Sequence, residues 1–97
     1  MRESAVEKKL GRFAKENKGL SLKWISPGMV GVPDRIVILS GGKIGFVELK
    51  APGCKPRQIQ QAVIRKLYRL GCRVASVDNS RSAEGFIRLL AKRGGIH

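Results

Sequence analysis

The stretch GVPDRIVILSGGKIGFVELKAP, residues 31–52, decides the fold of this 97-residue chain. Two apolar runs, 35–39 and 44–50, flank the sequence Ser-Gly-Gly-Lys, and a glycine pair at that place favours a tight turn. The stretch therefore predicts an antiparallel β-hairpin. Its first run, RIVIL, is apolar and β-branched, which is typical of a strand that is covered on both faces.

Three charges lie at the open end of this hairpin. Side chains alternate along a strand, so Glu48 and Lys50 point to the same face. If the two glycines form the turn, Asp34 lies opposite Glu48, where cross-strand Cβ atoms approach to about 5 Å. Carboxylates this close repel and raise each other's pKa values unless a cation lies between them. One interpretation is structural: Asp34 begins a turn, and Glu48 pairs with Lys50 on an exposed face.

The other interpretation is a metal site. A hard divalent cation such as Mg²⁺ takes carboxylate and carbonyl oxygens and keeps several waters. We predict that Asp34 and Glu48 hold such an ion, with the backbone carbonyl of Leu49 as a third ligand. Lys50 then orients or deprotonates a water on the metal and offsets negative charge as a phosphodiester is attacked.

The remaining segments carry helix and strand patterns. Apolar residues recur at helical spacing in residues 3–17, in residues 55–71 and in a last segment that ends near residue 93. Strand patterns cover residues 20–25 and 73–77. The order helix, strand, strand, strand, helix, strand, helix predicts an α/β fold, a mixed β-sheet flanked by helices, in one domain spanning residues 1–97. The second helix is expected to bury the stripe Ile59, Ala62, Val63, Leu67 and Leu70.

The first predicted helix carries an acid on its apolar side. Glu3 lies within about 60° of Val6 around the helix, inside the apolar stripe, whereas Glu7 falls at the edge of that stripe. An acid on the buried side needs a partner. Glu3 either caps the helix N-terminus or reaches the metal, directly or through water, with Glu7 as the substitute.

The composition indicates a polyanionic partner. Twenty lysines and arginines face seven acids, a net charge of +13, which makes nucleic acid the first candidate. The N-terminal residues lack the apolar core of a secretory signal, and no apolar run is long enough to cross a bilayer. We expect an intracellular protein, not secreted, with no membrane partner and with Cys54 and Cys72 as free thiols.

At these residues the chain resembles the PD-(D/E)XK nuclease superfamily, with Asp34 in the "PD" and Glu48 and Lys50 in the "ExK". More closely, it resembles the stand-alone VRR-NUC domain, in which a helix-borne Glu, a G-x-PD segment, an E-[VL]-K-A-P-G strand end and a Gln on the following helix recur in this order. Residues 31–34 and 48–53 match these segments, and Gln60 occupies the position of the family Gln. The family's helix-borne Glu maps best to Glu3.

The resemblance implies a restriction-endonuclease-like fold, Mg²⁺ or Mn²⁺ dependence, and hydrolysis of DNA phosphodiester bonds. It assigns Asp34 and Glu48 to the metal, Lys50 to the attacking water, and Gln60 to orienting Lys50 or the phosphate. Basic residues outside the site either follow the DNA backbone or form a solvated helix surface. They are Lys8, Lys9, Arg12, Lys55, Arg57, Arg65, Lys66 and Arg69.

One domain has one site and cuts one strand per encounter, so paired cuts need two copies in a fixed relation. Stand-alone members of the family look like two-fold junction-cutting enzymes. We therefore expect a homodimer that prefers Holliday junctions or other branched DNA, in the cytoplasm or nucleoid of a bacterial host. The turn at residues 40–43 and the last helix are candidate interfaces. The competing interpretation is a non-catalytic basic nucleic-acid-binding protein, which has no use for Asp34 because an acid repels phosphate.

Overall fold

The structure is a computed structural model, and it describes residues 2–93. Within these residues the order of elements is the predicted one. They are α1 (Glu3–Glu16), β1 (Leu20–Lys23), β2 (Arg35–Leu39), β3 (Lys43–Leu49), α2 (Gln58–Arg69), β4 (Arg73–Val77) and α3 (Ser80–Arg93). None of the described helices has the length and apolar character needed to span a bilayer.

The four strands form one mixed sheet in the order β1-β2-β3-β4. The predicted hairpin is confirmed: β2 and β3 are antiparallel, and Leu39 pairs with Lys43 across the turn. Gly41 and Gly42 have φ angles of 90° and 75°, in the region that glycine adopts without strain. β1 pairs antiparallel with β2, whereas β4 runs parallel to β3 after a crossover through α2.

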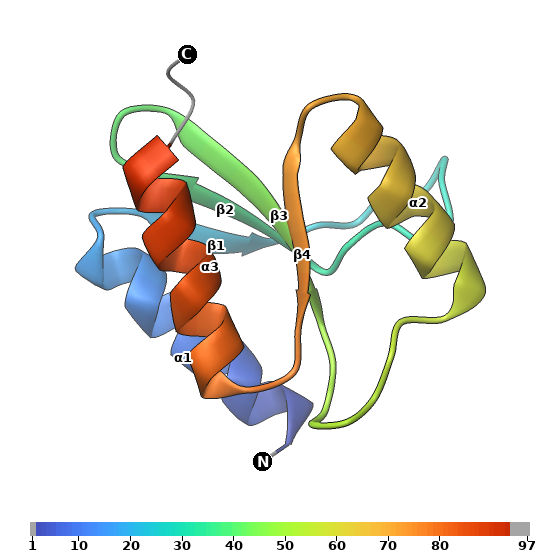
Figure 1. Cartoon of the computed structure of the whole chain (residues 1–97), viewed down its shortest axis with the longest axis horizontal. Helices are drawn as coiled ribbons and strands as arrows, with labels where there is room; N and C mark the ends of the chain where they lie inside the picture. The colour runs from blue at the N-terminus through green and yellow to red at the C-terminus, as the bar shows by residue number, and fades with distance from the viewer. Residues whose placement is uncertain (1, 94–97) are drawn as a thin grey trace.

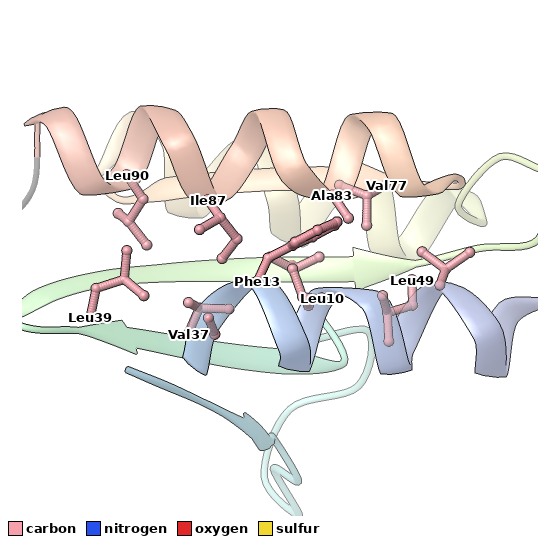
Figure 2. Packing of buried hydrophobic residues seen from close by; sticks show 12 residues of the cluster. Leu10, Phe13, Val37, Leu39, Leu49, Val77, Ala83, Ile87 and Leu90 are labelled. Carbon is pink, nitrogen blue, oxygen red and sulfur yellow. The ribbon is translucent and has the colours of Figure 1, made fainter. Parts of the chain in front are cut away.

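The main core lies between the sheet and the pair α1 and α3, which cover the same face (Figure 1). Alternate sheet residues such as Val37 and Val47 point into this core because strand side chains alternate between faces. Figure 2 shows Leu10 and Phe13 of α1 meeting Ile87 of α3 over the sheet. The predicted apolar stripe of the first helix is therefore confirmed.

The helix α2 lies on the other side of the sheet, beside β4 (Figure 1). Its buried residues are Gln60 and Val63. The predicted stripe is wrong in most of its members: Ile59 is 45% exposed and Leu70 is 75% exposed. A helix that rests on one strand buries a narrow line of side chains, so most of the apolar stripe faces solvent.

The prediction that β2 is covered on both faces is also wrong. Val37 and Leu39 are buried under α1, but Ile36 and Ile38 on the α2 side are only partly buried. Their neighbours on β1, Leu20 and Leu22, are each 45% exposed. The sheet therefore has one closed face and one face that is largely open toward its β1 edge.

Candidate active site

The open end of the β2–β3 hairpin brings the two predicted acids together. Arg35 pairs with Val47, so the antiparallel register continues with Asp34 opposite Glu48. The Asp34 carboxylate accepts a hydrogen bond of 2.8 Å from the backbone N–H of Leu49 through Oδ2. The Asp34 carbonyl accepts another, of 2.9 Å, from the N–H of Trp24. Asp34 is thus held on both sides, by β3 and by the end of β1.

Glu48 is the most unusual group in the described residues. Its side chain is fully buried, and neither carboxylate oxygen has a hydrogen-bond partner there. Burial raises the pKa of the Glu48 carboxyl, the nearby charge of Asp34 raises it further, and Glu3 adds to the effect. The ammonium of Lys50, 3.4 Å from Oε2, lowers the pKa but does not reverse the net rise. A buried carboxylate in this state needs a proton or a further cation.

Lys50 follows the last residue of β3 and points to the same side as Glu48, as predicted. Its side chain is 20% exposed, so the ammonium reaches from the buried carboxylate toward solvent. Its backbone N–H donates to the carbonyl of Val77 at 3.0 Å. Three residues further on, the N–H of Gly53 donates to Oδ2 of Asp78 at 3.1 Å. The loop that carries Lys50 is therefore tied to the end of β4 by Asp78, a contact that the sequence did not predict.

The two candidate acids of α1 have different surroundings. Glu3 and Glu7 line the same cleft as Asp34 and Leu49, a hollow of roughly 250 Å³ at the end of the sheet. Glu7 forms an ion pair with Arg35. Glu3 is exposed, so the prediction that it lies on the buried side of the helix is wrong. It has no ion pair within residues 2–93, and its charge contributes to the raised pKa of Glu48. The geometry therefore favours Glu3 as the acid that is available to a bound cation.

Two carboxylates of the site, those of Asp34 and Glu48, are the candidate metal ligands. Among the residues that the structure describes, no three side chains of His, Cys, Asp or Glu form a metal-binding group. Asp34 and Glu48 nevertheless suit Mg²⁺, because this ion is bound in proteins by one or two carboxylates together with waters and substrate phosphates. The buried Glu48 carboxylate, which has no hydrogen bond among the described residues and only Lys50 as an ion-pair partner, is the structural observation that a cation in this place would explain.

Gln60 has a structural role that the sequence did not reveal. It lies in the first turn of α2, is 7% exposed, and accepts a hydrogen bond of 2.8 Å from the N–H of Arg57 through Oε1. This contact caps the helix. No hydrogen bond joins Gln60 to Lys50 in the described part of the chain. Its predicted action on Lys50 or on a phosphate stays a prediction.

The residues predicted to contact the DNA backbone lie on α1, on the loop after β3 and on α2. Lys8 and Arg12 are exposed on α1, and Lys9 is partly buried there. Arg12 pairs with Glu16 at 3.7 Å, with both side chains more than half exposed, so this pair contributes little to stability. The exposed residues Lys55, Arg57 and Arg65 lie on the loop after β3 and on α2. The start of α1 and this loop lie at the same end of the molecule (Figure 1).

The fold and this set of two acids and a lysine at the end of a central hairpin define a restriction-endonuclease-like nuclease domain. A solved structure described as "VRR_NUC domain" matches with a TM-score of 0.82 and 30% identity, over 89% of this chain and 94% of that chain. "Putative nuclease p44" of Acyrthosiphon pisum secondary endosymbiont phage 1 is 44% identical over 79 residues, which are 81% of this chain and 85% of the relative. No family model matches the sequence. The chain belongs to the VRR-NUC family of nucleases, and the predicted fold is confirmed.

Proposed function

We propose that this VRR-NUC nuclease is a DNA endonuclease that depends on Mg²⁺, with Mn²⁺ as a substitute. The observation that carries the proposal is the Glu48 carboxylate, which is fully buried beside Asp34 with neither oxygen hydrogen-bonded among the described residues. Burial of such a group destabilises the folded protein. A hard cation bound beside the carboxylate would offset this cost.

Each residue then has a distinct task. Asp34 and Glu48 would hold the ion, and the Leu49 carbonyl and Glu3 are the candidates for further ligands. The bound ion would polarise the phosphate and lower the pKa of the attacking water. Lys50 orients that water or takes its proton, and its ammonium offsets the negative charge that builds up on the phosphate.

The resemblance to the VRR-NUC family implies DNA as the substrate, and the charge balance supports a polyanionic partner. The net charge of +13 attracts a polyanion, and the start of α1 lies at the same end of the molecule as the loop after β3 (Figure 1). Contacts of this kind address phosphate and shape more than bases. Paired cuts on a branched molecule such as a Holliday junction need two sites, so we propose a homodimer that prefers such junctions.

A panel of labelled linear duplex, flap, splayed and four-way DNA, incubated with Mg²⁺ or with EDTA, tests this proposal. We expect metal-dependent cleavage that is fastest on branched substrates. The variant Asp34→Asn should bind the same DNA and fail to cut it. Absence of a metal-dependent product on every substrate, with Asp34→Asn binding DNA as well as the wild type or better, would support the non-catalytic interpretation instead.

A further inference from the structure

The cleft at the end of the sheet holds two cations in addition to its acids. Its lining includes Lys23, the last residue of β1, and Arg35, the first residue of β2. These two residues are direct partners in the antiparallel register of β1 and β2. Neither belongs to the set of basic residues predicted to contact the DNA backbone.

The register places the two positive charges side by side. In the next pair the N–H of Trp24 donates to the Asp34 carbonyl, so Lys23 and Arg35 form a pair without hydrogen bonds between their backbones. In such a pair the Cα atoms lie about 4.5 Å apart and the side chains point to the same face. Like charges directly opposite each other destabilise a sheet. An anion beside them would remove this repulsion.

The protein itself supplies one anion for these two cations. Glu7 of α1 pairs with Arg35, whose side chain is only 18% exposed. Lys23 is exposed and forms no ion pair among the described residues, and Arg35 forms none there with Asp34 or Glu3. The pair therefore keeps an unbalanced positive charge inside the cleft.

We propose that Lys23 and Arg35 form a phosphate subsite, which binds the phosphate next to the scissile one on the cut strand. The proposal rests on the proposed function, because the acids of the site define which phosphate is scissile. Asp34 and Arg35 are consecutive residues, with Cα atoms about 3.8 Å apart, and they line the same cleft. An anion on Arg35 therefore lies beside the phosphate that is cut. The guanidinium offers paired N–H donors to phosphate oxygens, and the lysine adds a second charge.

Glu7 occupies Arg35 in the absence of DNA, and the phosphate takes its place. Glu7→Gln should therefore strengthen DNA binding about two- to five-fold, the range expected for loss of a competing, partly exposed ion pair. The matched control is Glu16→Gln, which removes the α1 acid that pairs with Arg12 outside the cleft. Equal DNA affinities of these two variants would contradict the exchange.

DNA binding in EDTA tests the phosphate contact independently of cleavage. Fluorescence anisotropy with labelled duplex and four-way DNA gives the affinity over a range of salt concentrations. Lys23→Gln should weaken binding about ten-fold at low salt and reduce the salt dependence by about one phosphate contact. Lys15→Gln is the matched control: it removes the same charge from an exposed residue in the last turn of α1, about 12 Å along the helix from Glu7. It should weaken binding about two-fold at most.

The position of the contact is tested by methylphosphonate substitution, which removes the charge of one phosphate at a time in the cut strand. In the wild type, a methylphosphonate next to the scissile bond should slow single-turnover cleavage at that bond about ten-fold. In Lys23→Gln and Arg35→Gln the same substitution should have little further effect, because the contact is already lost. If Arg35 served only to hold α1 through Glu7, its replacement would leave this penalty unchanged. Circular dichroism checks the fold of Arg35→Gln, and the exposed Lys23 provides the second variant.

Equal DNA binding by Lys23→Gln and Lys15→Gln would overturn the proposal. So would a methylphosphonate penalty that both Lys23→Gln and Arg35→Gln retain. Weakened binding by Lys23→Gln, together with no cleavage by the wild type on any substrate, would support the phosphate contact and contradict the proposed function. Metal-dependent cleavage with binding unaffected by Lys23→Gln would support the proposed function and overturn the subsite.

Discussion

Replacing Glu48 with glutamine should stabilise the protein when no divalent metal is present. The substitution keeps the shape of the side chain and removes a charge that is fully buried and lacks a hydrogen bond in the described structure. Lys50 opposes this effect, since it loses its ion-pair partner. Its side chain is 20% exposed, so its ammonium can hydrate instead. The raised pKa of Glu48 means that burial and the charges of Asp34 and Glu3 outweigh the attraction of Lys50.

The expected gain follows from the cost of a buried polar group that lacks a hydrogen bond. That cost is about 1–3 kcal/mol, and more for a charged group, so Glu48→Gln should raise the free energy of unfolding at pH 7 by about this amount. In a domain of 60–100 residues, each kcal/mol shifts the melting temperature by roughly 4–8 °C. The matched control is Glu84→Gln, which removes an exposed acid paired with Arg88 at 3.6 Å and should change stability by less than about 0.5 kcal/mol.

The gain should depend on pH in a defined direction. The folded-state pKa of Glu48 lies above its ordinary value of 4.5, so the folded protein holds the proton more tightly than the unfolded chain. Stability from this group is therefore greatest below pH 4.5 and falls as the pH rises from there to the raised folded-state pKa. The difference between Glu48→Gln and wild type should vanish at low pH and reach its full size above that window.

Divalent metal should reverse the order of stability. At 100 times its dissociation constant, a ligand of the folded state stabilises by about 2.7 kcal/mol. Thermal unfolding of wild type, Glu48→Gln and Glu84→Gln in EDTA, Mg²⁺ and Mn²⁺ measures all of these effects. A Glu48→Gln variant that is less stable than wild type in EDTA, together with no effect of metal on the wild type, would refute the reasoning. Glu48 would then be one half of a structural ion pair with Lys50.

Three further substitutions test the parts of the site separately. Lys50→Ala should keep the stabilisation by bound metal and lower the single-turnover cleavage rate at least ten-fold. Acid–base catalysis or charge stabilisation typically contributes a factor of about 10² or more to a rate. A near-wild-type cleavage rate would remove Lys50 from the mechanism. Asp78→Ala removes the acceptor of the Gly53 N–H and loosens the loop that carries Lys50. Cleavage should slow, while the stabilisation of the protein by bound metal should be unchanged. An unchanged cleavage rate would show that this hydrogen bond is not needed for activity. Gly31→Ala should cost about 1–3 kcal/mol in urea unfolding, because Gly31 has a φ of 91° and a Cβ there would lie 3.1 Å from Ile59; an unchanged midpoint would show that the loop relaxes freely.

The hairpin and the pairing of its acids could be predicted from the sequence because both depend on local rules. The glycines at 41 and 42 set the turn, the turn sets the register, and the register places Asp34 opposite Glu48. The alternation of strand side chains then puts Lys50 beside Glu48. None of these steps needs knowledge of a distant part of the chain.

The exposed apolar surfaces could not be predicted in the same way. Apolar periodicity shows which side of α2 is suited to burial, but the width of the buried strip depends on how many strands the helix crosses. Ile59 and Leu70 therefore remain exposed although they belong to the stripe. The same limit applies to β2, where a β-branched run indicated cover on both faces and the structure leaves Ile36 and Ile38 partly open.

Two polar contacts near the site were missed for opposite reasons. The ion pair between Glu7 and Arg35 joins α1 to β2, and it depends on how the helix lies across the sheet. The sequence alone favoured Glu3 and kept Glu7 as the substitute, and the ion pair of Glu7 agrees with that order. Gln60 shows the opposite case: its capping contact with Arg57 is local, but the resemblance to the family drew attention to a role in the site.

The most direct test of the central claim is the position of a divalent ion in the protein. Crystals grown with Mn²⁺ allow the ion to be located from its anomalous scattering. The account predicts a peak bound by carboxylate oxygens of both Asp34 and Glu48, at about 2.0–2.3 Å, with Lys50 nearby but not bound to it. An absence of any peak between these two acids at saturating Mn²⁺, with Glu48 paired only to Lys50, would contradict it.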